Sequence, residues 1–142
     1  MKVRSLMTRD VKVARPGDTI EQVARLMLDA DTGAVPVVDE GTVIGLITDR
    51  DIVLRVVAQN RPLTLPVSEA LTPNVEFCFE DDDLTEVSEK MARLQLRRIV
   101  ILDQDRKLAG ILSLGDLAQQ ADPIESGLTL EQVSKPEPPL SH

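Results

Sequence analysis

The sequence predicts a protein of the α/β class (α+β), in which a strand-helix-strand-strand-helix unit occurs twice in tandem. The first observation is an internal repeat: residues 3–57 align with residues 67–121 at a shift of 64, which becomes 65 after one inserted residue. The second is that apolar residues follow helical and strand periodicities in the same order in each copy. The third is a composition of 42% hydrophobic and 1% aromatic residues, which predicts a core of aliphatic side chains.

The repeat rests on nine identities and on apolar positions that match apolar positions nearly throughout. We expect repeat 1 at residues 1–60, repeat 2 at 61–121, and a loosely held tail at 122–142 with one short helix around 129–134. One copy has too few residues to cover both faces of a sheet, so the two should pack as a pseudo-two-fold pair. The identical pairs are Val3 and Val67, Thr8 and Thr72, Val11 and Val75, Asp18 and Asp82, Val23 and Val87, Met27 and Met91, Asp39 and Asp103, Gly45 and Gly110, and Asp51 and Asp116.

The elements of each copy follow from caps, turns and periodicity. Asp18, with Glu21 three residues later, is the expected N-cap of the first helix. Glu40 and Gly41 separate two apolar runs and predict a hairpin. The expected elements of the first copy are a strand at 11–13, a helix at 18–30, strands at 34–39 and 42–48, and a helix at 51–58. Those of the second copy are 75–79, 84–94, 98–103, 107–113 and 115–121.

The closing helix of the first copy is apolar on nearly all sides, which suits burial on more than one face. Its extra apolar face has three possible partners: the internal core alone, the second copy, or a second chain. We expect the last of these to give a homodimer. The apolar residues are Ile52, Val53, Leu54, Val56 and Val57.

Composition excludes several function classes. A net charge of −8 and few aromatic residues argue against nucleic-acid binding, which relies on Lys, Arg and stacking rings. Cys78 is the only cysteine, so no internal disulfide forms, and no apolar run is long enough for a membrane helix. We therefore expect a cytoplasmic protein. The acidic run 80–83 lacks the spacing of a metal loop, and His142, in the tail, is given no chemistry.

Two copies of one motif, "GLITDRD" at 45–51 and "GILSLGD" at 110–116, are the candidate functional feature. Thr48 with Asp51, and Ser113 with Asp116, match a capping box that begins a helix. The same geometry also suits a nucleoside phosphate. A helix N-terminus attracts phosphate, a hydroxyl can donate to it, and a carboxylate one turn later can accept from ribose hydroxyls.

The tandem motifs, with "VPVVD" before the first and "IVILD" before the second, resemble the CBS domain, named after cystathionine beta-synthase, and a pair resembles a Bateman module. The resemblance covers about residues 1–121 and is greatest to small stand-alone bacterial proteins. It implies two clefts between the repeats that take AMP, ADP, ATP, NAD or S-adenosylmethionine as a regulator, with no obligatory cofactor. It also implies that the phosphate-contacting hydroxyls are Thr48 and Ser113, and that the ribose carboxylates are Asp51 and Asp116.

The resemblance assigns the adenine edge to the backbone of Ala34, Val35 and Pro36, with Val13 and Ala14 opposite. Arg98 matches a basic residue that some relatives place on phosphates. The chain departs from the pattern at two positions. Val100 replaces the equivalent of Pro36, and Ala34 carries no charge, so Arg50 could supply the cation of the first cleft.

Three functions remain open from the sequence. The first is a non-catalytic sensor that binds an adenosyl ligand and signals through its oligomer or a protein partner. The second is a structural or partner-binding pair with vestigial clefts. The third is an enzyme using Asp49, Arg50 and Asp51, which the missing nucleophile–base pair and metal ligands disfavour. Arg97 and Arg98 could also be a solvated or dimer-facing pair.

Overall fold

The computed structural model describes residues 1–120, which form two compact units. The first-repeat unit consists of Asp10–Glu76 with Arg106–Leu108. The second-repeat unit consists of Met1–Arg9 and Phe77–Asp105 with the described residues 109–120. The helix expected around 129–134 and His142 lie outside the described residues.

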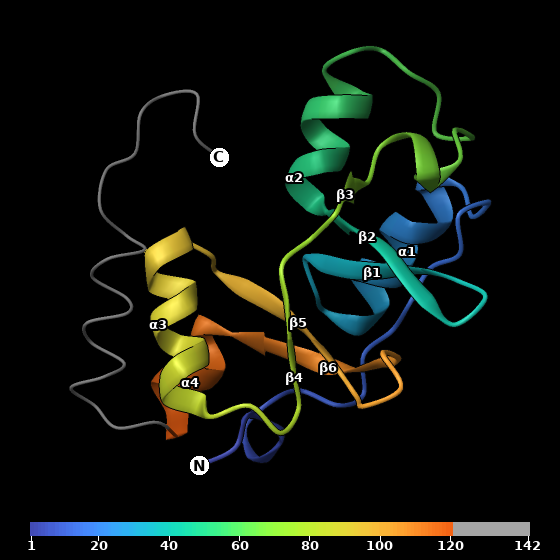
Figure 1. Ribbon diagram of the computed structural model, residues 1–142. Coiled ribbons are helices and arrows are strands. Elements are labelled where there is room, and N and C mark those ends of the chain that lie inside the picture. The colour runs from blue at the N-terminus through green and yellow to red at the C-terminus, as the bar shows by residue number, and fades with distance from the viewer. Residues whose placement is uncertain (121–142) are drawn as a thin grey trace. The chain divides into compact units, whose positions relative to one another are not determined.

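The first-repeat unit contains one sheet, of order β1-β2-β3, with antiparallel pairing throughout (Figure 1). The sheet consists of β1 (Ala34–Asp39), β2 (Thr42–Thr48) and β3 (Thr72–Pro73). The helices are α1 (Ile20–Ala30), α2 (Asp49–Ile52) with a π-helical continuation at Val53–Val57, and a 3-10 turn at Val67–Glu69.

Helix α1 confirms the predicted amphipathic helix but begins one residue later than expected. Its N-cap is Thr19, whose hydroxyl accepts from the Gln22 N–H at 3.1 Å while the Gln22 side chain accepts from the Thr19 N–H at 2.8 Å. Asp18, the expected N-cap, instead accepts from the Arg15 N–H at 2.9 Å and closes the preceding turn. Aspartate and threonine side chains can both accept the hydrogen bond that caps a helix. The sequence alone therefore does not show which of Asp18 and Thr19 is the N-cap, and the backbone conformation decides it.

The hairpin around Glu40 and Gly41 is confirmed, because both residues have positive φ (50° and 83°), as a tight right-twisted hairpin requires. The strand predicted at 11–13 is wrong. Only Ala14 pairs with β1, through an isolated parallel bridge to Val37. The two valines at 11 and 13 favour an extended strand. They do not form one because only the next residue, Ala14, reaches the edge of the sheet.

The second-repeat unit has the sheet order β4-β5-β6, with β4 parallel to β5 across helix α3. Its elements fall within about two residues of those predicted, and a 3-10 turn at Val3–Ser5 is added to them. The elements are β4 (Phe77–Phe79), α3 (Leu84–Leu94), β5 (Arg98–Leu102), β6 (Leu108–Ser113) and α4 (Leu114–Gln120).

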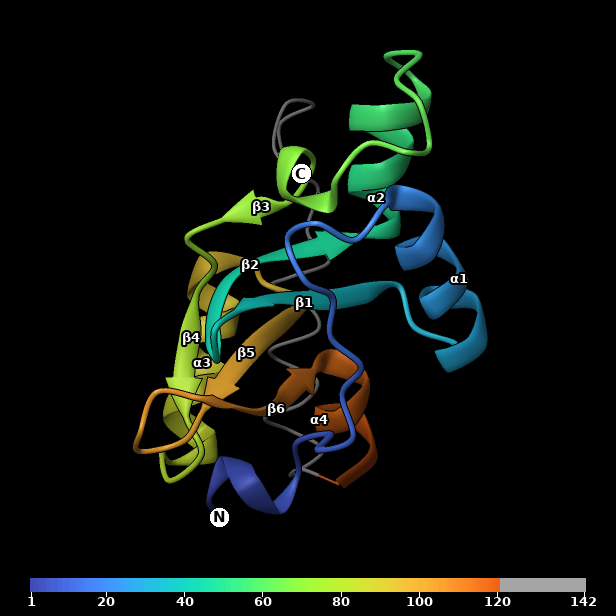
Figure 2. The same cartoon turned by 90° about the vertical axis from the view of Figure 1, so that its right-hand side faces the viewer.

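Each unit takes its leading segment from the other repeat, so compact units and sequence repeats do not coincide. The N-terminal turn lies beside the end of β4 and the start of α3 (Figure 2), where the Val3 N–H donates to the Asp82 carbonyl at 3.0 Å. Residue Val67 makes the equivalent bond to the Asp18 carbonyl, at 2.8 Å, in the first-repeat unit. The two repeats therefore exchange their leading segments.

The two aliphatic cores include the exchanged segments. In the first-repeat unit, Leu65, Val67 and Ala70 are buried with residues of α1, β1 and β2. In the second-repeat unit, Val3, Leu6 and Met7 are buried with residues of α3, β5 and α4. The exchange therefore contributes apolar burial, the main favourable term in folding, as well as backbone pairing.

Ion pairs also tie the N-terminal segment to its unit. Asp81 receives a hydrogen bond from Gln104 at 3.1 Å and lies 3.0 Å from Arg4 Nη1 and 3.6 Å from Lys2 Nζ. The Gln104 bond, followed by the charges of Arg4 and Lys2, lowers the pKa of Asp81 below its ordinary value of 3.8. Because the pKa of Asp81 is lower in the folded state, its ionised carboxylate stabilises the fold at pH values above the ordinary pKa. This stabilisation is lost as the pH falls through the folded-state pKa.

The glycine that begins each seven-residue motif makes room for the exchanged segment. A Cβ on Gly45 would lie 2.6 Å from the Thr72 carbonyl oxygen and 2.6 Å from Leu71 Cδ1. A Cβ on Gly110 would lie 2.5 Å from the Thr8 carbonyl oxygen. These distances are too short for any side chain, and the obstructing atom is backbone in both copies. The two glycines are therefore required by a close backbone approach.

We predict that Gly45→Ala lowers the free energy of unfolding by about 1–3 kcal/mol, the usual cost of overpacking. This loss should exceed the gain of about 0.4–1 kcal/mol that Gly→Ala gives at an unstrained position. Gly17→Ala is the matched control, since nothing lies within 4 Å of its added Cβ. Urea denaturation measures both, and a Gly45→Ala protein as stable as Gly17→Ala would contradict the close approach.

Candidate ligand-binding site

The first motif forms a reciprocal capping box at the junction of β2 and α2. The Asp51 N–H donates to Thr48 Oγ1 at 3.1 Å, and the Thr48 N–H donates to Asp51 Oδ2 at 3.0 Å. Thr48 has extended backbone angles and is half-buried, and the Asp51 side chain is 14% exposed. The capping interpretation of the motif is thus confirmed as local structure.

The second motif repeats this geometry at the junction of β6 and α4. The Asp116 N–H donates to Ser113 Oγ at 3.1 Å, and the Ser113 N–H donates to Asp116 Oδ2 at 2.9 Å. In each box the carboxylate uses one oxygen for the cap. An ionised carboxylate offers about four lone-pair sites, so acceptor capacity remains for a ligand.

A threonine from the exchanged segment joins each carboxylate, and the sequence analysis did not include either one in the site. Thr72 Oγ1 lies 3.4 Å from Asp51 Oδ1 and 3.5 Å from Oδ2. Thr8 Oγ1 lies 3.5 Å from Asp116 Oδ1. The available signal was that Thr8 and Thr72 are one of the nine identical pairs. Each site therefore combines a cap hydroxyl, a carboxylate and a second hydroxyl.

Arg55 is a further residue that the sequence analysis missed. Its Nη1 donates to the carbonyls of Ala70 at 3.1 Å and Leu71 at 2.9 Å, and its Nη2 lies 3.9 Å from Asp51 Oδ1. The guanidinium thus connects the helix that follows the motif to the exchanged segment. The spacing of four residues from Asp51 was the signal that could have identified it.

The strand residues assigned to the adenine edge lie beside the first motif. Ala34 pairs with Thr48 across β1 and β2, and Pro36 is two residues along the same strand. Ala14 lies next to β1, since its N–H donates to the Pro36 carbonyl at 2.9 Å. The side chains of Ala14, Ala34, Val35 and Pro36 are buried, and that of Val13 is exposed. The structure therefore brings this predicted group together in one unit.

The two basic residues lie differently. Arg50, on α2, is exposed, and its N–H donates to Asp49 Oδ1 at 2.8 Å. Arg98 begins β5 and is half-buried, and the preceding Arg97 accepts a backbone bond from Leu114, directly after Ser113, at 3.0 Å. A basic residue thus lies on the helix of the first motif, and another begins the strand next to the second motif.

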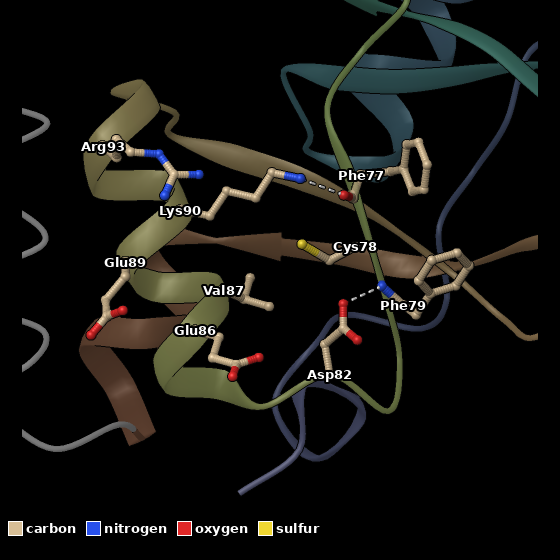
Figure 3. A pocket seen from close by; sticks show the side chains of 9 residues that line it. All are labelled: Phe77, Cys78, Phe79, Asp82, Glu86, Val87, Glu89, Lys90 and Arg93. Carbon is tan, nitrogen blue, oxygen red and sulfur yellow. Dashed lines mark hydrogen bonds between the residues drawn. The ribbon is translucent and has the colours of Figure 1, made fainter.

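A groove of about 480 Å³ lies between β4 and α3, apart from the predicted site residues (Figure 3). Lys90 Nζ donates to the Phe77 carbonyl at 2.9 Å, and Asp82 Oδ2 accepts from the Phe79 N–H at 2.9 Å. The two phenyl rings meet edge to face with centroids 5.7 Å apart. The charged side chains of Lys90, on α3, and Asp82, in the preceding turn, thus form hydrogen bonds with the backbone of β4. These bonds protect β4 against pairing with a strand of another molecule.

Among residues 1–120, no cluster of three or more His, Cys, Asp or Glu side chains is placed to hold a metal ion. The same part of the chain contains no helix long and apolar enough to span a membrane.

Two repeats of one sheet-and-helix unit, each with a hydroxyl and a carboxylate where its hairpin meets its closing helix, define a paired-repeat module. The model of the CBS domain family matches residues 3–58 and 67–121. The chain belongs to the CBS domain family, and the predicted α+β fold of tandem repeats is confirmed.

Relatives and solved structures agree with this assignment. The chain is 40% identical over 133 residues to the CBS domain-containing protein YhcV of Bacillus subtilis, covering 93% of this chain and 94% of that protein. It is 39% identical over 137 residues to the uncharacterized protein YlbB of Bacillus subtilis, covering 94% and 92%. It is similar in structure to the CBS domain pair of protein MJ0100 in complex with 5′-methylthioadenosine and S-adenosyl-L-methionine. The TM-score is 0.74 and the identity 26%, covering 84% of this chain and 98% of that one.

Proposed function

We propose that the protein is a non-catalytic regulatory module that binds an adenosyl ligand at its hydroxyl–carboxylate motifs and signals through its oligomer or a protein partner. The observation that carries the proposal is the repetition of one constellation, Thr48–Asp51–Thr72 and Ser113–Asp116–Thr8, in both units. A capping box alone does not require the second threonine. The complex of the MJ0100 domain pair with two adenosyl compounds supports the ligand class.

Each group in the constellation has a definite role in this proposal. The Thr48 or Ser113 hydroxyl and the positive end of the helix dipole that follows it address phosphate or another polar group on C5′ of the ribose. Asp51 or Asp116 accepts from the ribose hydroxyls with the lone pairs that its cap leaves open. Arg50 and Arg98 supply positive charge for anionic ligands, and the strand residues from Ala34 to Pro36 meet the adenine. AMP, ADP, ATP and NAD present all of these features, and S-adenosylmethionine presents the adenine and the ribose hydroxyls.

The second candidate function is a structural or partner-binding pair whose sites are vestigial. One observation favours it: both carboxylates and both hydroxyls already have partners within the protein. A ligand must therefore share or displace the bonds from Thr72 and Thr8, which at 3.4–3.5 Å are long and weak. Ligand titration distinguishes the two functions.

The ligand proposal predicts that Asp51→Asn weakens adenosyl binding about 10- to 100-fold. The amide keeps the shape but loses the charge that strengthens hydrogen bonds from ribose, worth about 1.5–3 kcal/mol. A thermal-shift panel of AMP, ADP, ATP, NAD, S-adenosylmethionine and a guanine nucleotide should first show an adenine-specific shift in the wild type. Asp51→Asn should then lose much of that shift.

Asp18→Asn is the matched control, because Asp18 also accepts a backbone N–H at 2.9 Å but lies outside the motif. It should keep the ligand shift of the wild type. A lower melting temperature for ligand-free Asp51→Asn with an intact ligand shift would mean that Asp51 serves only the cap. An absence of any adenine-specific shift in the wild type would favour the structural alternative.

We also propose that the protein forms a homodimer through the closing helix of the first repeat. Ile52 and Val56 are buried in the unit, whereas Val53, Leu54 and Val57 are 54%, 45% and 61% exposed. Three neighbouring exposed aliphatic side chains on one helix support this proposal, because contiguous apolar patches often serve as interaction surfaces.

The dimer proposal predicts a mass of twice 15.6 kDa by light scattering at micromolar concentration. Leu54→Glu should shift the mass towards one chain, because a charge would be buried without a partner. Leu63→Glu, at a residue that is 51% exposed outside this helix, should leave the mass unchanged. A wild-type mass of 15.6 kDa at every concentration would rule out the dimer.

A further inference from the structure

Arg55 makes the two sites chemically unequal. The residue four positions after Asp51 is Arg55, whereas the residue four positions after Asp116 is Gln120. Arginine carries a permanent charge and a planar fork of donors, and glutamine carries neither. The repeats thus share the hydroxyls and the carboxylate but differ at the cation that approaches the first carboxylate.

The contacts of Arg55 close a ring around Asp51. Its guanidinium donates to the adjacent carbonyls of Ala70 and Leu71 at 3.1 and 2.9 Å and approaches Asp51 Oδ1 at 3.9 Å. The next residue of that segment, Thr72, returns to the same carboxylate oxygen at 3.4 Å. One side chain therefore contacts both the carboxylate of the site and the backbone that carries the second hydroxyl.

Val67 and Ala70 anchor the start of this segment in the core, but little strand pairing holds its end at the site. Strand β3 comprises only Thr72 and Pro73, which pair with Leu46 and Gly45. A strand of two residues has little ladder pairing, so the two charged hydrogen bonds from Arg55 add to the interactions that fix the end of the segment. Arg55 itself lies in the π-helical turn Val53–Val57, an irregularity often found at functional positions.

We infer, on the basis of the proposed adenosyl function, that Arg55 is a positioning residue that holds the Thr72 segment and Asp51 in the arrangement that receives the ribose. The site of the first repeat is therefore organised before the ligand arrives, and it binds more tightly than the site of the second repeat. Preorganisation raises affinity because less ordering is left for the binding step. Arg55 acts through Asp51 and Thr72 and does not itself contact the ligand.

The first test needs no ligand. Amide hydrogen exchange in the peptide covering 67–76 should become about tenfold faster in Arg55→Gln, because the bonds that hold the segment are lost. Exchange in the hairpin 34–48 should change little. Arg25→Gln is the matched control, since Arg25 pairs with Glu21 at the same i,i+4 spacing on exposed α1. Equal exchange at 67–76 in wild type, Arg25→Gln and Arg55→Gln would overturn the inference.

The second test uses AMP as the probe in calorimetry on the full chain. Arg55→Gln should weaken the tighter of the two sites about tenfold, so that both sites bind with similar weak affinity. Arg55→Lys should restore only part of the affinity, because an ammonium cannot present the fork that bridges two carbonyls. Arg25→Gln should bind as wild type.

The outcomes separate this inference from the proposed function. Unchanged AMP affinity in Arg55→Gln, or full restoration by Arg55→Lys, would refute the positioning role. If the wild type binds no AMP, the proposed function fails for this ligand, and the exchange experiment still decides whether Arg55 holds the segment. A lower melting temperature without a change in affinity would show a purely structural role and would also overturn the inference.

Discussion

The close approach of a leading segment to the first glycine of each motif is the contact on which the rest of each unit depends. At Gly45 and Gly110 the backbone of the exchanged segment lies where a Cβ would be. That approach lets Thr72 pair with Leu46, and Thr8 with Ile111, at the strand that leads into the motif. It also buries the apolar residues of the segment in the core of the unit. A larger residue at either position would push the leading segment away from the strand that leads into the motif.

The same contact builds the candidate site. A strand that ends at a helix N-terminus supplies a hydroxyl and a carboxylate, and the exchanged segment adds a second hydroxyl from the other repeat. The site therefore exists only when the segment is in place, and residues more than 20 positions apart in the chain contribute to it. In the first unit Arg55 reinforces the arrangement with charged hydrogen bonds. Stability and the proposed ligand recognition share one set of interactions.

Features that depend on residues close together in the sequence could be predicted. Features that depend on the exchange of leading segments between the repeats could not. Capping boxes at Thr48 and Ser113, the hairpin turn at Glu40 and Gly41, and the amphipathic helices all follow from short-range patterns. The strand expected at 11–13 would have needed to pair with β1, and only Ala14 does so. Thr72 and Thr8 join the site across the exchange of segments, which periodicity does not reveal. Arg55 was visible only through its spacing of four residues from Asp51, and its carbonyl partners come from the same exchanged segment.

The measurement that tests the account most directly is an NMR titration of the isotope-labelled full chain with AMP. If the exchanged segment completes an adenosyl site, the amides of Thr48, Asp51 and Thr72 shift together at low AMP, and those of Ser113, Asp116 and Thr8 follow at higher AMP. Shifts confined to the groove beside Phe77 and Lys90, or shifts at Thr48 and Asp51 without Thr72, would contradict it.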